Sequence, residues 1–273
     1  MRNTIYVNGR YDGIGNRLEE LLRIEHHCIS NNLMCFYYWD NSGNDDRRYP
    51  ILFKSVNIRI QDKVKYPINM IGDIGWMTSR EQMIVAAKNV RLIKPLELVN
   101  HAYIGVHIRT GDRIRHPVPH NDFMDVRMFR EIFEFTIKQI NLEKPEYIFI
   151  CSDAKDYRDE MISRLDSDIN VIDPLVTKYP LQVYNDFYAL SNATKIYMCS
   201  KFSSFAITAS ILTNIPIVSF FEEGESNLIR YHANVIIVRL PQKFGSVMYA
   251  QIMRWLLSFK IFSHRVYTLL HRI

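Results

Sequence analysis

The segment GVHIRTGD, residues 105–112, places a histidine and an arginine at the end of an apolar run with the composition of a buried strand. His107 and Arg109 are two residues apart, so in a strand they lie on the same face. A guanidinium can bind a diphosphate through two hydrogen bonds, and an imidazole can bond a sugar or a base. Arg109 could thus hold a diphosphate, and His107 could orient a sugar or a base edge. The structural alternative is that Arg109 pairs with Asp112 or Asp153.

A second apolar run, EYIFICSD, ends in Ser152 and Asp153. In doubly wound parallel sheets ligands bind beyond the carboxyl ends of the strands, so residues at these ends are candidates for a binding site. The carboxylate of Asp153 could accept hydrogen bonds from ribose hydroxyls or from the edge of a guanine. It could equally cap the helix that we expect to begin at Ala154, and the sequence leaves both interpretations open.

Two turns that lead into helices offer backbone amides to an anion. Gly13 and Gly15 allow close approach of the backbone, and Asn16 begins an amphipathic helix; an ordinary strand-to-helix turn is the alternative. Further along, Ser203 and Ser204 begin another helix, where hydroxyls and amides together could hold a phosphate. N-capping explains one of these serines but does not require both.

The elements that position these residues alternate between strands and helices. Strands are predicted at 3–9, 33–40, 102–109, 146–153, 169–174, 195–200, 215–221 and 234–241. Helices are predicted at 16–30, 79–88, 126–140, 154–165, 181–191, 203–213 and from about 246. Several strands are apolar throughout, which is typical of parallel sheets covered on both faces and predicts an α/β fold. The stretch 41–65, rich in Asn, Gly, Asp and Arg, interrupts this alternation.

The bulk composition indicates a folded globular protein with an anionic partner. The chain has 273 residues, 48% of them hydrophobic and 23% charged, which allows one large domain or two modest ones. The net charge of +5 is spread along the chain, so a nucleic-acid partner is not expected. Lys94-Pro95 suggests a boundary near residue 95. We predict an N-terminal domain at 1–95, a second domain at 96–245 and a terminal helix at 246–273.

Cysteine usage and acidic motifs favour a protein without bound metal. The cysteines lie in apolar runs without a C-x-x-C pair, which predicts reduced core thiols at Cys28, Cys35, Cys151 and Cys199. The Asp-x-Asp motif, Asp166 to Asp168, follows a helix in a polar segment. We interpret it as a solvated turn rather than a Mg²⁺ or Mn²⁺ site.

The ends of the chain bear on localisation. The opening MRNTIYVNGR enters a strand without a long apolar segment, and no uncharged apolar stretch reaches about 18 residues, so we expect a cytoplasmic protein. The segment 246–273 is basic and amphipathic. We expect its first part to pack on the core and its last turns to contact the anionic inner face of the cytoplasmic membrane.

Taken in order, these motifs resemble the fucosyltransferase superfamily that includes bacterial α-1,2-fucosyltransferases, the Nod-factor α-1,6-fucosyltransferase and the protein O-fucosyltransferases. The likeness covers residues 5–35 and 103–221 and lies in a G-x-G-N-[QR]-L turn (Gly13 to Leu18), an H-x-R-x-x-D signature (His107, Arg109, Asp112), a strand ending in Ser-Asp (Ser152, Asp153) and a D-F-x-x-L-S helix followed by a serine turn (Asp186, Leu190, Ser191, Phe202, Ser203, Ser204). The chain departs from many relatives at Thr110, where they have a second arginine. It also has Asp112-Arg113 and Phe205-Ala206 where bacterial α-1,2 enzymes usually have Asp-Tyr and Trp-Trp.

The resemblance implies a GT-B arrangement of two Rossmann-like halves, with GDP-fucose held mainly by the second half. It implies that Arg109 binds the diphosphate and stabilises the departing GDP, and that Asp153 recognises the nucleoside. The phosphate would be held by Ser203, Ser204 and the amide of Phe205, and His107, Gly15 and Asn16 would complete the donor site.

The activity implied is inverting, metal-independent transfer of L-fucose to a hydroxyl of a glycan, as in O-antigen or capsule synthesis on a lipid-linked acceptor. A GT-B enzyme with another nucleotide sugar and a non-catalytic nucleotide-sugar-binding protein are the alternatives. The sequence does not rank the candidates for a general base, which are Asp12, Glu19, Asp112, His116 and Asp122.

Overall fold

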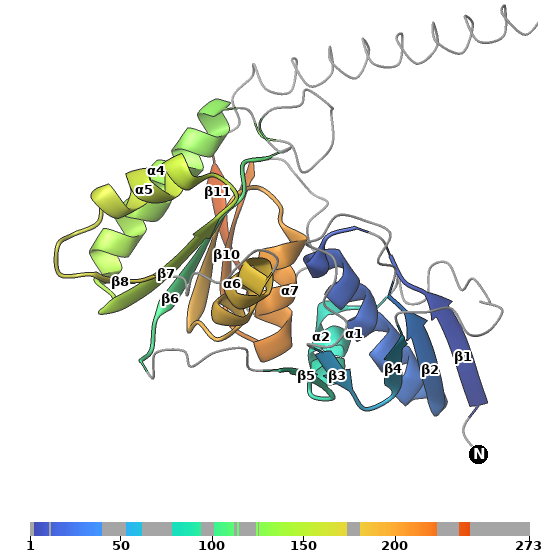
Figure 1. The fold of residues 1–273 in the computed structure, drawn as a ribbon. Helices are drawn as coiled ribbons and strands as arrows, with labels where there is room; N and C mark the ends of the chain where they lie inside the picture. The colour runs from blue at the N-terminus through green and yellow to red at the C-terminus, as the bar shows by residue number, and fades with distance from the viewer. Residues whose placement is uncertain are drawn as a thin grey trace, which may run out of the picture.

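The fold consists of parallel sheets with helices between and around them (Figure 1). The computed structural model describes residues 3–10, 12–39, 53–61, 78–93, 101–111, 114, 124, 126–173, 181–222 and 235–240. The strands are β1 (Asn3–Asn8), β2 (Leu33–Tyr38), β3 (Phe53–Ser55), β4 (Ile58–Gln61), β5 (Val90–Leu92), β6 (Ile104–Ile108), β7 (Tyr147–Ser152), β8 (Asn170–Ile172), β9 (Lys195–Cys199), β10 (Ile217–Glu222) and β11 (Val235–Leu240). The helices are α1 (Ile14–Asn31), α2 (Arg80–Ala87), α4 (Val126–Glu143), α5 (Lys155–Ser163), α6 (Leu181–Ser191) and α7 (Ser204–Thr213).

The larger sheet has six parallel strands in the order β11-β10-β9-β6-β7-β8. Counted from β6, this is the 3-2-1-4-5-6 order of the Rossmann fold, and the strand order reverses between β6 and β9. In folds of this type, ligands generally bind at such a reversal, outside the carboxyl ends of the strands. In the first half of the chain, β1, β2 and β4 form a parallel sheet, and β3 and β5 form a separate antiparallel pair.

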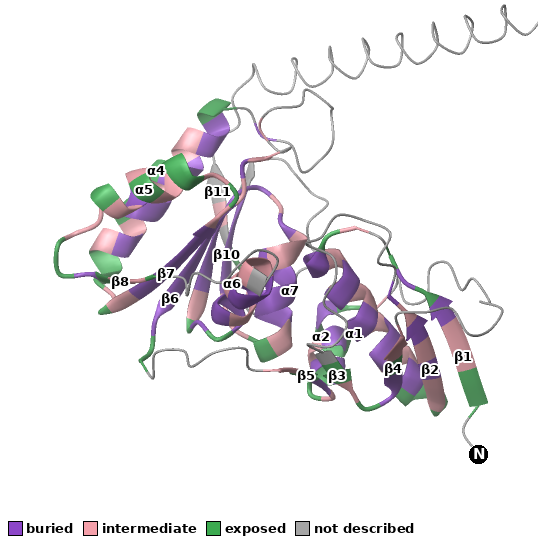
Figure 2. Cartoon of the chain, in the orientation of Figure 1, coloured by how far each residue is buried: buried purple, intermediate pink, exposed green. Residues whose placement is uncertain are grey.

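The central strands of the larger sheet are apolar because both of their faces are covered. All five residues of β6 are buried. Figure 2 shows the central strands mostly in purple, the colour of buried residues. One face packs against α4 and α5, where Phe129, Phe133 and Met161 are fully buried. The opposite face packs against α6 and α7. The α/β class predicted from these apolar runs is confirmed.

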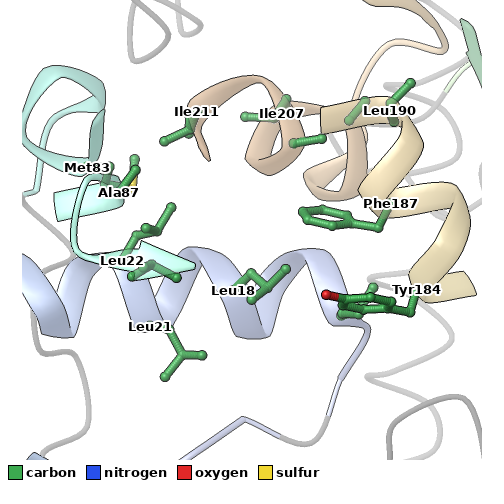
Figure 3. Packing of buried hydrophobic residues seen from close by; sticks show 14 of the residues in the cluster. Leu18, Leu21, Leu22, Met83, Ala87, Tyr184, Phe187, Leu190, Ile207 and Ile211 are labelled. Carbon is green, nitrogen blue, oxygen red and sulfur yellow. The ribbon is translucent and has the colours of Figure 1, made fainter. Parts of the chain in front are cut away.

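A single hydrophobic core joins the two halves of the chain. Leu18 and Leu22 of α1 belong to the same buried cluster as Phe187 of α6 and Ile207 of α7, and Figure 3 shows these side chains between the helices. Polar contacts cross the same boundary: Thr208 Oγ1 donates to the carbonyl of Gly15 at 3.0 Å. The halves are therefore packed on each other rather than linked only by the chain.

Most predicted elements are confirmed, with ends that differ by a few residues. The sequence analysis assigned no strand within 41–65 or at 90–92, and this was wrong, because β3 and β4 lie in the first segment and β5 is the second. These strands have three or four residues, too short to give a periodic pattern. The boundary predicted at residue 95 and the segment 246–273 lie outside the described residues and stay predictions.

Two further expectations concern thiols and membranes. The four cysteines are free and buried, as predicted. No helix in the described part of the chain is long and apolar enough to cross a membrane.

The shared core predicts that the two halves unfold together. Leu18→Ala, at a position 1% exposed, should lower the free energy of unfolding by about 2–5 kcal/mol, since it leaves a cavity between α1 and α7. Ile29→Ala on the same helix, 41% exposed, should change it by less than about 0.5 kcal/mol. Urea unfolding followed by tryptophan fluorescence and by circular dichroism should give coincident transitions. Two separate transitions would contradict the shared core.

Candidate functional site

A cavity of about 440 Å³ lies where the carboxyl ends of β6 and β7 meet the N-termini of α1 and α7. Its lining residues are Asp12, Gly13, Ile14, Gly15, Asn16, His107, Arg109, Cys151, Ser152, Asp153, Val183, Asp186, Ser203, Ser204 and Phe205. All eight donor-site residues proposed from the sequence are among them. The structure therefore brings the predicted residues together, while their roles stay predictions.

Two helix N-termini line this cavity. Helix α1 begins after the N-cap Gly13, and α7 begins after the N-cap Ser203. Glycine has no side chain, and the Ser203 hydroxyl makes no capping hydrogen bond to α7. Neither first turn contains an acidic residue. Both helix starts thus keep unpaired amides and a partial positive charge that a bound anion could satisfy.

The two helix starts touch each other at Gly15. A Cβ atom on Gly15 would lie 2.5 Å from the backbone nitrogen of Phe205, closer than real Cβ atoms come to other atoms. The close approach expected of Gly15 is therefore made to α7. A Cβ atom on Gly13 would meet no atom within 4 Å. The side chain of Asn16 donates to Asp12 Oδ2 at 2.8 Å, which fixes the turn before α1.

His107 is held between α7 and β7. Its Nε2 lies 2.9 Å from Ser203 Oγ, its Nδ1 lies 3.4 Å from Cys151 Sγ, and its ring stacks on Phe205 with centroids 5.1 Å apart. Burial lowers the pKa of His107 to about 4, and the charge of Arg109 acts in the same direction. His107 is therefore neutral at pH 7. Ser203 occupies the N-cap position, but its hydroxyl bonds His107 instead of capping α7, so simple N-capping does not explain it.

Asp153 organises the loop that follows β6. Its carboxylate accepts hydrogen bonds from the amides of Thr110 and Gly111, each at 2.8 Å, and from Thr110 Oγ1 at 2.9 Å. Arg109 Nη1 lies 3.3 Å from Asp153 Oδ2, so the structural pairing considered above is present. The side chain of Arg109 remains 39% exposed and borders the cavity.

The alternative that Asp153 caps α5 is wrong. The N-cap of α5 is Ala154, whose amide donates to Ser152 Oγ at 3.0 Å. The carboxylate of Asp153 points to the β6 loop instead, and this choice depends on a contact 43 residues distant in sequence.

Asp186 of α6 is a lining residue that the sequence analysis did not propose for the site. It accepts a hydrogen bond from Gln182 Nε2 at 2.7 Å, and burial raises its pKa to about 6. A carboxylate within the apolar stretch that runs from Val183 to Leu190 was the signal that could have identified it. Asp186 thus joins Asp12 and Asp153 as a carboxylate of the cavity, and it has hydrogen-bonding capacity beyond its protein partner.

The five candidates for a general base differ in where they lie relative to the cavity. Asp12 lines the cavity and pairs with Arg10 at 2.6 Å, whereas Glu19 pairs with Arg23 and is not a lining residue. Asp112, His116 and Asp122 lie outside the described residues.

Asp166 to Asp168 form part of the polar connection between α5 and β8, as expected from the sequence. Among the residues that the structure describes, no group of three or more His, Cys, Asp or Glu side chains could hold a metal ion.

The strand order is that of a GT-B-like fold, and the cavity lies at the switch point of its second half. The sequence matches no protein-family model and no curated protein. Among solved structures, the chain is similar to NodZ alpha-1,6-fucosyltransferase soaked with GDP-fucose, with TM-score 0.54 and 13% identity over 81% of this chain and 95% of that one.

Two further structures give the same fold. The fucosyltransferase NodZ from Bradyrhizobium has TM-score 0.50 and 14% identity, covering 80% of this chain and 96% of its own. POFUT1 in complex with GDP has TM-score 0.53 and 10% identity, covering 87% of this chain and 98% of its own. The protein therefore has the fold of GT-B fucosyltransferases.

The contact between the helix starts predicts that Gly13 and Gly15 differ in how well they tolerate substitution by alanine. Gly15→Ala should lower the free energy of unfolding by about 1–3 kcal/mol, because the new methyl group meets the backbone of Phe205. Gly13→Ala should cost less than about 1 kcal/mol, since open space surrounds that position. Chemical unfolding measures both. Equal stability of the two variants would show that α1 and α7 are not in contact at this point.

The raised pKa of Asp186 predicts a pH-dependent cost in stability. A carboxyl with a raised pKa binds its proton more tightly in the folded state, so stability falls as pH rises from about 3.8 to about 6 and stays low above that range. Asp186→Asn should therefore stabilise the protein at pH 7.5, by roughly 1–3 kcal/mol, and change little at pH 4. The exposed Asp168→Asn is the control. If D186N gains no stability at pH 7.5, the carboxyl is not desolvated.

Proposed function

We propose that the protein is a glycosyltransferase that transfers L-fucose from GDP-fucose to a hydroxyl group of a glycan, with inversion and without a metal ion. The observation that carries this proposal is the position of Arg109, at the carboxyl end of β6 and beside the N-terminus of α7. The shared fold supports it, because NodZ fucosyltransferase was soaked with GDP-fucose and POFUT1 was solved with GDP.

The diphosphate would lie between Arg109 and the start of α7. There the guanidinium and the amides of Ser204 and Phe205 would carry the negative charge that develops when the bond between sugar and phosphate breaks. Preorganised donors of this kind stabilise a transition state because they need no rearrangement as the charge appears. Asp153 fixes the loop that carries Arg109 and so keeps the guanidinium in place.

The nucleoside would extend toward Asp153 and Asp186. Asp153 already accepts three hydrogen bonds from Thr110 and Gly111, whereas Asp186 accepts one from Gln182. A carboxylate can accept from both N1–H and the N2 amino group of guanine, a pair of donors that adenine, uracil and cytosine do not present. Asp186 thus supports a preference for a guanine nucleotide, while Asp153 acts on the donor mainly through Arg109.

The acceptor would enter on the side of the first half of the chain. Asp12, which lines the cavity, is the described candidate for removing the proton of the attacking hydroxyl. We propose as acceptor a glycan of bacterial surface polysaccharide, such as O-antigen or capsule, on a lipid carrier at the inner face of the membrane. The alternatives are another nucleotide sugar as donor and a binding protein without turnover.

Nucleotide selectivity and turnover test this function. GDP should raise the melting temperature more than UDP, CMP or ADP, with or without EDTA; a ligand at 100 times its Kd stabilises by about 2.7 kcal/mol. Arg109→Ala should weaken stabilisation by GDP and reduce transfer from GDP-fucose by roughly 10²–10³-fold, as for loss of one transition-state donor.

Arg127→Ala is the control, because Arg127 lies on α4 with a side chain 73% exposed. Selective stabilisation by UDP or CMP would show that the donor is not GDP-fucose. Dependence of transfer on a metal ion would contradict the metal-free mechanism. No response to any nucleotide would contradict the proposal as a whole.

A further inference from the structure

The charges around the cavity do not match a diphosphate on their own. Among the described lining residues, Asp12, Asp153 and Asp186 are acidic and Arg109 is the basic partner. A bound nucleoside diphosphate would add more negative charge to this group. Helix N-termini supply partial positive charge, but a further full positive charge would improve the balance. His107 lines the same cavity and is able to gain one.

The hydrogen bonds around His107 determine what its neighbour can offer to a phosphate. Cys151 Sγ lies 3.6 Å from the carbonyl oxygen of Val106, to which its S–H donates, and 3.4 Å from His107 Nδ1. With the thiol hydrogen directed at that carbonyl, the sulfur accepts from Nδ1–H. Neutral imidazole then has an unprotonated Nε2, which accepts the hydroxyl hydrogen of Ser203 at 2.9 Å.

In this arrangement the Ser203 hydroxyl is unsuited to a phosphate. Phosphate oxygens without a proton only accept hydrogen bonds, and the hydrogen of Ser203 is already directed at the imidazole. Ser203 would present lone pairs to the anion. Without a phosphate, the Ser203 hydroxyl donates to His107 Nε2. With a phosphate bound, Ser203 would have to accept from His107 in order to donate to the phosphate.

We propose that His107 takes up a proton when a nucleoside diphosphate enters the cavity, and that this proton reverses the bond to Ser203 so that the serine hydroxyl donates to the phosphate. The proton comes from the solvent and binds Nε2, which then donates to Ser203 Oγ. The hydroxyl hydrogen of Ser203 rotates to a phosphate oxygen. The diphosphate site gains one hydrogen-bond donor and one positive charge, and no covalent bond other than N–H is formed.

The surrounding charges explain why the proton is absent from the empty cavity and present in the occupied one. Burial and Arg109 at the end of β6 keep His107 neutral, while Asp153 of β7 opposes them more weakly. From the other packed elements, α7 presents the uncharged Ser203 and Phe205.

Two further acidic groups share this cavity with His107. Asp186 of α6 and Asp12 before α1 line the same cavity. The bound diphosphate would bring its own negative charge close to the ring. One negative charge about 4 Å from the ring, in a medium of effective dielectric constant about 20, raises the proton affinity of an imidazole roughly a thousandfold. That brings a pKa of about 4 close to neutrality.

Proton uptake can be measured directly by calorimetry of GDP-fucose binding. This inference rests on the proposed function, because it requires a nucleoside diphosphate in the cavity. GDP-fucose is the probe because neither of its phosphates titrates near neutral pH. Titrations in two buffers with different ionisation enthalpies give the number of protons taken up. We expect roughly half a proton at pH 6.5, close to none at pH 8.5, and tighter binding at the lower pH.

Two variants assign the proton. His107→Gln can still bond Ser203 but has no titrating group, so it should bind GDP-fucose without proton uptake. His101→Gln is the matched control, because His101 is exposed and does not line the cavity, and it should keep the uptake. ¹⁵N NMR of the histidine rings in the wild-type protein gives a test that does not depend on a variant folding. One neutral histidine should become an imidazolium when GDP-fucose is added at pH 6.5.

The outcomes separate the inference from the function on which it rests. Absence of GDP-fucose binding at every pH would overturn the proposed function. Binding without proton uptake would overturn the inference alone, as would uptake that persists in H107Q. A histidine spectrum unchanged by GDP-fucose, in a protein that binds it, would have the same meaning.

Discussion

The contact between the N-termini of α1 and α7 is the constraint on which the site depends. The two helices approach so closely at Gly15 that no side chain fits between it and Phe205. Both starts carry partial positive charge, so their proximity is electrostatically unfavourable. The hydrophobic core beneath them, with Leu18, Phe187 and Ile207, holds them together in spite of this. A bound anion would relieve the repulsion between the two helix starts.

The side chains then refine what the helix starts provide. Arg109 adds a full charge, and Asp153 fixes the loop that carries it. His107 links this strand end to the start of α7 through one hydrogen bond to Ser203. Asp186 is half-buried in the same cavity, and its burial raises its pKa to about 6.

The position of the site could be predicted from the sequence, but its internal contacts could not. In a parallel sheet all carboxyl ends meet at one edge, so residues at the ends of apolar runs, such as Arg109 and Asp153, had to lie near each other. The bond between His107 and Ser203 joins residues 96 apart, and no local pattern encodes it. The strands β3, β4 and β5 were missed because three or four residues carry too little periodicity, whereas β8 is as short but lies in the apolar run INVIDP.

A crystal structure of the protein with GDP-fucose would test the central claim most directly. The account predicts the diphosphate within hydrogen-bonding distance of Arg109 and of the amides of Ser204 and Phe205, with guanine near Asp186 and the sugar toward Asp12. A nucleotide bound elsewhere, or with its diphosphate away from the start of α7, would contradict the account.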